Sequence, residues 1–243
     1  MAFSHTTSSI FERCIQSSKN SDLVYGLTEM CNFFGWSNAT FFGSGITRNK
    51  PNDNVVITTY PNDWISRYSD KNYKYIDPIV LEGSRSLLPL DWSEVTESSP
   101  ELMTFFGEAE EMGVGKSGLT VSVRGLRGDS SLFSVNSAEQ GHKWQQQKNE
   151  ILSDLTYWAH LFHNIVLKQK NSQCQNKQIR LTRREQDVLR WAAKGKTAWE
   201  TAKILNLSDK TISFYISNAN IKLGVATKTQ AVARAISERL LVM

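Results

Sequence analysis

The first residues that could do chemistry are a carboxylate and three aromatic side chains. Tyr60, Trp64 and Tyr68 precede Asp77 at short spacings. Trp64 and Tyr68 are four residues apart, so they share one face if this stretch is helical. Because Tyr and Trp have a polar group that needs a partner when buried, such a set could line a pocket for a ligand with an apolar tail and a small polar head. Aromatic-rich regions are more often plain hydrophobic core, and that alternative stays open.

Asp77 itself has two interpretations that its spacing does not separate. A buried carboxylate is costly unless it is hydrogen-bonded, so Asp77 could be a group that a ligand completes. Asp77 also stands directly before Pro78, the pattern of a helix with an aspartate N-cap and a proline at its first position.

A second group of candidate residues lies on a predicted helix near the C-terminus. Lys210, Ser213, Ser217 and Asn220 recur at helical spacing. One cation and small hydrogen-bonding side chains fit the DNA major groove, where base edges offer donors and acceptors. The alternative is a solvated helix with ordinary surface lysines.

Basic residues around this helix suit phosphate contacts, which position a protein on DNA without reading its sequence. They are Lys194, Lys196, Lys210, Lys222 and Lys228. Thr197 and Thr211, at the starts of the second and third predicted helices, complete the set expected to contact DNA.

Three short helices position these residues. Thr182 and Glu185 have the spacing of a capping box, which starts the first helix. A second helix is predicted over 197–205. Ser208 begins the third helix, and Gly224 ends it.

Charge divides the 243-residue chain into two parts. From Asn176 onward there are 13 Lys and Arg residues against 5 Asp and Glu residues, whereas the preceding part has 15 against 19. A basic tail on a mildly acidic body indicates that only the tail meets nucleic acid. The cysteines, Cys14, Cys31 and Cys174, are scattered, which favours reduced thiols over disulfides or a metal site. No signal peptide or membrane-spanning run is visible, so we expect a soluble, cytoplasmic protein with no membrane partner.

The first part alternates helices and strands. Helices are predicted over 8–18, 21–35 and 142–168, from Pro61, from Asp77-Pro78 and from Ser99-Pro100, and strands over 38–46, 54–60, 117–124 and 131–136. This order predicts an α+β domain with an antiparallel sheet between helices, an α-β-α sandwich. We expect this domain at residues 1–168, a polar linker at 169–178 and a small all-α helix-turn-helix domain at 179–243.

Three motifs in the tail are specific. They are E-x-x-V-L-x-W-x-A-x-G-K-T from Glu185, T-I-S-F-Y-x-x-N-x-x-x-K-L-G-V from Thr211, and K-T-Q-A-V-A from Lys228. Together they closely resemble the C-terminal DNA-binding domain of LuxR-type regulators. In that resemblance, Ser213 and Ser217 stand where some members of the family read bases with arginines.

Upstream, Y-P-x-x-W-x-x-x-Y from Tyr60, the Asp77-Pro78 pair, Trp92 and Gly118 resemble the autoinducer-binding domain of the same family. This resemblance implies a ligand of the N-acyl-homoserine lactone class. It implies that Trp64 donates to the lactone carbonyl and that Asp77 accepts from the ligand amide N–H.

The same resemblance implies further pocket residues. Tyr60 would donate to the acyl carbonyl, and Ser134, in the third or fourth strand, would add a hydroxyl group there. The implied walls of the pocket are Tyr68, Trp92, Phe105 and Ala109.

No catalytic constellation is visible, so we expect neither an enzyme nor a cofactor. The sequence lacks the metalloprotease, nucleophile-elbow, phosphate-loop and dinucleotide motifs. His160 and His163, three apart on the long predicted helix, are expected to be surface or interface residues.

These observations predict a ligand-responsive transcription factor that senses an N-acyl-homoserine lactone in quorum sensing. We expect a homodimer on a two-fold operator in double-stranded DNA, with RNA polymerase as a partner if the protein is an activator. The long helix is one candidate dimer surface, and Val232, Ala233 and Ile236 are another. Two alternatives stay open: an orphan regulator that responds to a different small molecule or to none, and an anti-activator that forms heterodimers.

Overall fold

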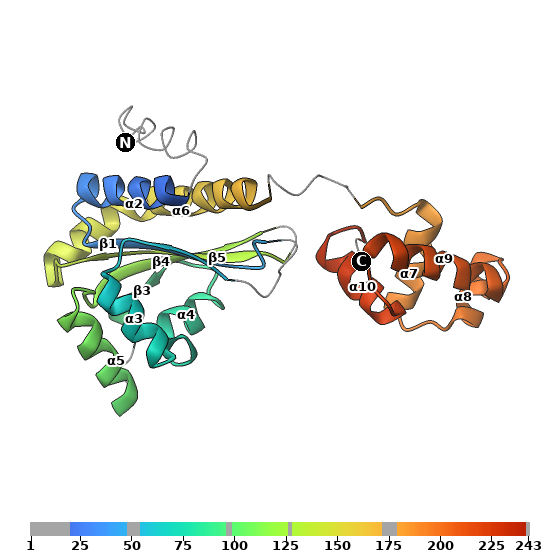
Figure 1. Cartoon of the computed structure of the whole chain (residues 1–243), viewed down its shortest axis with the longest axis horizontal. Helices are drawn as coiled ribbons and strands as arrows, with labels where there is room; N and C mark the ends of the chain where they lie inside the picture. The colour runs from blue at the N-terminus through green and yellow to red at the C-terminus, as the bar shows by residue number, and fades with distance from the viewer. Residues whose placement is uncertain (1–19, 48–53, 96–98, 126–127, 172–178, 242–243) are drawn as a thin grey trace. The chain divides into compact units, whose positions relative to one another are not determined.

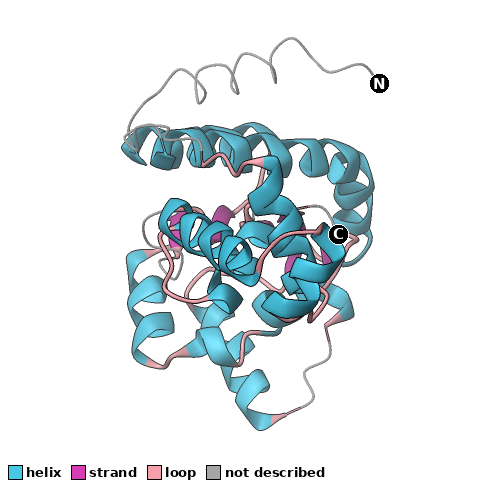
Figure 2. Cartoon of the chain, turned by 90° about the vertical axis from the view of Figure 1, so that its right-hand side faces the viewer, coloured by secondary structure: helices cyan, strands magenta, loops and turns pink. Residues whose placement is uncertain are grey.

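The computed structural model describes residues 20–47, 54–95, 99–125, 128–171 and 179–241, and the chain divides near residue 173 into two compact units. Helices make up most of the described chain (Figure 2). The helix predicted over 8–18 lies outside the described residues. None of the helices in the described ranges combines the length and apolarity that a membrane crossing needs.

The first unit contains a five-stranded antiparallel sheet between two layers of helices (Figure 1), which confirms the predicted sandwich. The strand order is β2-β1-β5-β4-β3. The strands are β1 (Asn38–Ser44), β2 (Val55–Thr58), β3 (Leu90–Asp91), β4 (Ser117–Arg124) and β5 (Ser130–Ser137). β3 has only two residues, too few to show an alternating pattern, so Ser134 lies in the fifth strand and the prediction of the third or fourth was wrong.

Helices cover both faces of this sheet (Figure 1). One face carries α2 (Asn20–Phe34) and α6 (Gly141–Asn171); the other carries α3 (Asn62–Asp70), α4 (Pro78–Gly83) and α5 (Pro100–Glu111). Two 3-10 helices, η1 (Tyr73–Tyr75) and η2 (Trp92–Glu94), connect these elements. α6 continues three residues past its predicted end at Lys168.

Strand pleat sorts side chains between the two faces. Odd-numbered residues such as Phe41, Leu119 and Phe133 are buried in the core under α2 and α6. The apolar stripe predicted for α6 is buried there as well: Trp144, Ile151, Leu155, Trp158, Phe162 and Ile165. Even-numbered residues face α3, α4 and α5, where a second aromatic cluster lies.

The second unit consists of α7 (Arg183–Ala193), α8 (Ala198–Leu205), α9 (Asp209–Leu223) and α10 (Lys228–Ser237). The predicted helix signals are confirmed. Thr182 and Glu185 form a capping box at α7, the Ser208 side chain caps α9, and Gly224 ends α9 with a φ of 62°. Local sequence therefore sets the ends of the helices that carry the DNA-contact candidates.

Candidate functional site

A cavity of about 410 Å³ lies on the even-numbered face of the sheet. All eight residues expected to bind a ligand line it, although they come from separate segments of the chain: Tyr60, Trp64, Tyr68, Asp77, Trp92, Phe105, Ala109 and Ser134. Apolar side chains, including Phe42, Val56 and Leu132, form much of the remaining wall. The cavity thus offers room for an apolar chain beside a few polar groups.

Trp64 is the centre of the aromatic wall. It is buried, and its ring centroid lies 5.8 Å from that of Tyr68, 5.9 Å from that of Tyr73 and 5.7 Å from that of Phe105. These distances are typical of favourable aromatic pairs. Within the described ranges, no group accepts a hydrogen bond from the Trp64 indole N–H, so this donor in the cavity wall is available to a ligand.

Asp77 both caps a helix and lines the cavity, so its two interpretations are compatible. Its Oδ1 accepts from the backbone N–H groups of Ile79 (2.8 Å) and Val80 (3.4 Å), at the start of α4. Its Oδ2 accepts from the Tyr68 hydroxyl at 2.9 Å. Burial raises the pKa of Asp77 to about 6, although these three hydrogen bonds each lower it. At neutral pH the cavity therefore contains a buried carboxylate that is incompletely stabilised.

A row of four hydroxyl groups crosses the even-numbered face of the sheet, and three of them, those of Thr40, Thr58 and Ser134, line the cavity. Of these three, only Ser134 was expected from the sequence. Strand register places Thr58, Thr40, Ser134 and Thr120 side by side on β2, β1, β5 and β4. Neighbouring hydroxyl oxygens are 2.5 Å apart for Thr40 and Thr58 and 2.8 Å apart for Thr120 and Ser134. The even-numbered parity of Thr40 and Thr58 within predicted strands was the available signal, but register was needed to align them.

Trp92 contributes its ring rather than a free donor. Its indole N–H donates to Thr120 Oγ1 at 2.8 Å. A Cβ atom at Gly118 would lie 2.5 Å from the Trp92 ring, so glycine is needed for this close packing. Trp92 and Gly118, both part of the resemblance, thus form a single packing unit, and its Trp92 ring lines the cavity.

The expectation that His163 is a surface or interface residue was wrong, because this α6 residue is buried where the helix packs on the sheet. Its Nε2 lies 2.7 Å from Asp129 Oδ2, and its Nδ1 lies 2.7 Å from Ser131 Oγ. Burial lowers the pKa of His163, and Asp129 partly offsets this shift. All three residues are buried on the odd-numbered side of the sheet, away from the cavity, so this serine, histidine and aspartate form a core contact that a substrate cannot reach. His160 is exposed, as expected.

In the second unit, α9 presents the expected groove-binding surface only in part. Lys210, Ser213 and Ser217 are exposed. Asn220 is half-buried beside them; its Nδ2 donates to the Ala226 carbonyl at 3.5 Å, and its Oδ1 is buried without a hydrogen-bond partner. Thr211 is also half-buried, and its hydroxyl lies 2.8 Å from that of Ser208.

The lysines expected to contact phosphates differ in whether another protein group already contacts their ammonium groups. Lys222 Nζ lies 2.8 Å from both carboxylate oxygens of Glu185, which is buried. Burial alone would raise the pKa of Glu185, but Lys222 and Thr182 together hold it below its usual value. Lys194 lies over the ring of Trp191, with its Nζ 4.7 Å from the centroid.

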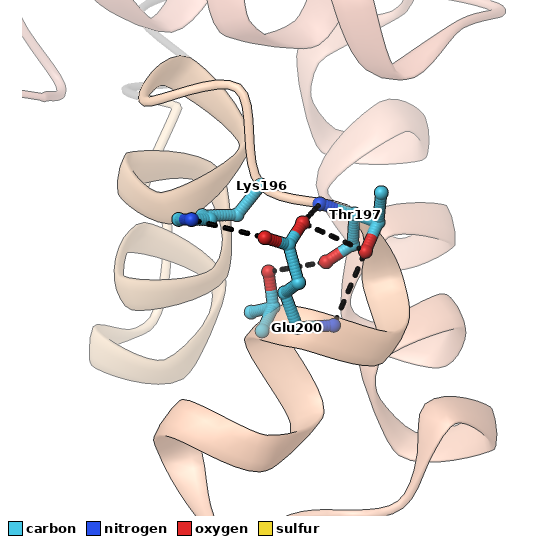
Figure 3. Close-up of polar contacts among 4 residues, drawn as sticks. Lys196, Thr197 and Glu200 are labelled. Atoms are coloured by element: carbon cyan, nitrogen blue, oxygen red, sulfur yellow. Dashed lines mark hydrogen bonds and ion pairs between the residues drawn. The ribbon is translucent and has the colours of Figure 1, made fainter.

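Lys196 and Thr197 are engaged at the start of α8 (Figure 3). Lys196 Nζ donates to Glu200 Oε1 at 2.9 Å, and the Thr197 backbone N–H donates to Glu200 Oε2 at 2.8 Å. The hydrogen bond from Thr197 and the contact with Lys196 lower the pKa of Glu200 to about 2. By contrast, Lys210 and Lys228 are exposed and form no ion pair with another described residue.

Comparison with known proteins identifies both units. The family "Autoinducer binding domain" matches residues 20–166, and "Bacterial regulatory proteins, luxR family" matches residues 180–235. The transcriptional activator protein RaiR of Rhizobium etli is 34% identical over 77% of this chain and 76% of its own length. The transcriptional activator protein VanR of Vibrio anguillarum is 32% identical over 91% of each chain.

The fold is also found in a solved structure. SdiA of Escherichia coli aligns with a TM-score of 0.65 and 21% identity over 98% of this chain and 97% of its own. The relatives are transcriptional regulators and not enzymes. The chain therefore belongs to the LuxR family of transcriptional regulators, with an autoinducer-binding domain followed by a DNA-binding helix-turn-helix domain.

Proposed function

We propose that this regulator binds an N-acyl-homoserine lactone in its cavity and that this ligand controls its binding to DNA. The apolar walls suit the acyl chain, and the polar groups near Asp77 suit the lactone and the amide. In this proposal Trp64 donates to the lactone carbonyl, Asp77 accepts from the amide N–H, and Tyr60 donates to the acyl carbonyl.

The observation that carries the proposal is the state of Asp77. Its carboxylate is buried, has a raised pKa and has no cation among its described contacts. An amide N–H from the ligand would add a charge-assisted hydrogen bond where the protein supplies too few. Ligand binding would then stabilise the folded first unit by mass action.

Control of DNA binding follows from that stabilisation. A well-ordered first unit would pair with a second copy and present two helix-turn-helix units to a two-fold operator in the cytoplasm. The candidate dimer surfaces remain α6 and the last helix, α10, with Val232, Ala233 and Ile236. RNA polymerase is the further partner if the bound protein activates transcription.

A ligand panel tests this proposal. N-acyl-homoserine lactones of increasing chain length are added to the purified full chain, and thermal stability and retention of a selected DNA duplex are measured. We expect one range of chain lengths to raise both quantities, and the lactone-opened acids, which carry an extra negative charge, to raise neither. DNA retention that no lactone changes, in a folded sample, would refute ligand control.

An acylglycerol is the second candidate ligand. SdiA has been solved in complex with octanoyl-rac-glycerol, in a structure that aligns with this chain at a TM-score of 0.66 and 21% identity. The hydroxyl groups of Thr40, Thr58 and Ser134 in the cavity wall could bind the glycerol hydroxyls. If octanoylglycerol stabilises the protein more than every lactone in the same panel, this candidate replaces the first.

A further inference from the structure

An exposed stripe on α9 overlaps the predicted DNA-contact face but adds two large apolar side chains to it. Lys210, Phe214, Ser217 and Ile221 follow one another at spacings of four, three and four residues, so they share one side of the helix. The opposite side carries the buried residues Ile212, Ala219 and Leu223. Phe214 is 60% exposed and Ile221 is 76% exposed, which places two large apolar side chains on the outermost line of the helix.

The position of Phe214 in α9 indicates which partner its exposed ring would contact. α9 is the third helix of a unit that matches the LuxR family, and it is the second helix of the helix-turn-helix motif that α8 and α9 form. The second helix of such a motif enters the major groove with its N-terminal residues on the base edges. Phe214 is the sixth residue of α9 and lies one turn from Lys210, whose charge suits DNA. Its neighbours Ser213 and Ser217 are exposed and can hydrogen-bond to bases.

The major groove has one apolar feature that a phenyl ring can recognise. Among the four base pairs, the C5-methyl group of thymine is the apolar group on the groove edge, and phenylalanine is one of the side chains that contact it. Burying an exposed ring against this methyl group is favourable because both lose contact with water. A cytosine at the same position offers a polar amino group and no methyl group.

We propose that Phe214 is a specificity-determining residue that contacts the C5-methyl group of one thymine in each half of the operator. The proposal depends on DNA binding by the second unit and not on the identity of the small-molecule signal. Ile221, the thirteenth residue of α9, is also exposed and apolar but lies near the C-terminal end of the helix. It therefore serves as the matched control.

The test removes a single methyl group from the DNA. Duplexes that bind the full chain, with and without the panel of N-acyl-homoserine lactones, are selected from a random library. Each thymine in the selected sequence is then replaced in turn by deoxyuridine, which differs only at C5. We expect one symmetry-related thymine pair to matter, with an affinity loss of about fourfold for each methyl group.

Protein variants then assign that loss to a residue. Phe214→Ala is expected to bind the thymine and uracil duplexes equally, Phe214→Leu to retain part of the discrimination, and Ile221→Ala to retain all of it. Circular dichroism of each variant confirms that the exposed substitutions leave the helices folded. The proposal is overturned if no uracil substitution weakens binding, if Phe214→Ala keeps the wild-type ratio, or if the chain selects no DNA sequence. The last result would refute sequence-specific DNA binding itself, whereas the first two would remove only the role of Phe214.

Discussion

Two buried carboxylates, one in each unit, are treated in opposite ways. Asp77 and Glu185 each accept a hydrogen bond from a backbone N–H group at the start of a helix. Glu185 also contacts Lys222, and its pKa is lowered. Asp77 has only the Tyr68 hydroxyl as a side-chain partner, and its pKa is raised. The helix-turn-helix unit thus supplies a cation to its buried carboxylate, whereas the first unit supplies none to Asp77, where the proposed ligand would add a hydrogen bond.

Removing the Lys222 cation tests how much the ion pair stabilises the buried Glu185 carboxylate, and this change has the largest expected effect. Lys222→Met leaves a buried carboxylate without its ion pair, which costs about 3 kcal/mol, at the low end for buried pairs because the Lys222 side chain is 37% exposed. We expect faster amide hydrogen exchange throughout α7 and α9 of the full chain, measured by mass spectrometry.

The matched control is the double variant Glu185→Gln with Lys222→Met. It removes both charges, so much of the lost protection should return. If Lys222→Met leaves exchange unchanged and only weakens DNA binding, Lys222 acts on phosphates, as the sequence suggested, and the ion pair contributes little to stability.

The pH dependence of the stability of the ligand-free protein tests whether burial destabilises the Asp77 carboxylate. The pKa of Asp77 rises from 3.8 to about 6 on folding, so the folded state binds the proton more tightly than the unfolded state. The stability that this group contributes is complete below about pH 4 and is lost as pH rises through 6, by roughly 2–3 kcal/mol in all.

The measurement compares wild type with Asp77→Asn in urea unfolding at constant ionic strength from pH 4 to pH 7. Other titrating groups, including Glu185, whose lowered pKa works in the opposite direction, are common to both proteins and cancel in the difference. Asparagine can still cap α4. We expect the variant to gain stability relative to wild type as pH rises; a constant difference would mean that Asp77 is not destabilised by burial.

Ligand binding should depend on the same charge. Asp77→Asn replaces a charge-assisted hydrogen bond by a neutral one, so we expect the affinity for the best lactone of the panel to fall about tenfold. Isothermal titration calorimetry at pH 7 measures this change. Tyr68→Phe, which removes one hydrogen bond from the carboxylate but keeps its charge, should have a smaller effect. Equal affinities of Asp77→Asn and wild type would exclude Asp77 from the ligand contacts.

The two units also differ in how far the sequence predicted them. In the second unit, helix ends depend on residues close together in the chain, such as Thr182 with Glu185, and these could be read directly. In the first unit, the floor of the cavity depends on strand register, which aligns Thr40 with Ser134 across 94 positions. The sequence pattern predicted four of the five strands but neither the two-residue β3 nor that alignment. The burial of His163 was missed because Asp129 and Ser131 become its neighbours only when α6 packs on the sheet.

The smallest expected effect separates free lysines from engaged ones within the second unit. Lys210 is exposed and unpaired within the described ranges, whereas Lys196 contacts Glu200. If Lys210 contacts a phosphate, Lys210→Ala should weaken binding to all DNA sequences and reduce the slope of log affinity against log salt by about one. Lys196→Ala should reduce the slope less, because Glu200 already neutralises that charge. Fluorescence anisotropy at several salt concentrations measures both slopes. Equal reductions would show that the Lys196–Glu200 ion pair breaks on DNA and that Lys196 then contacts phosphate as freely as Lys210 does.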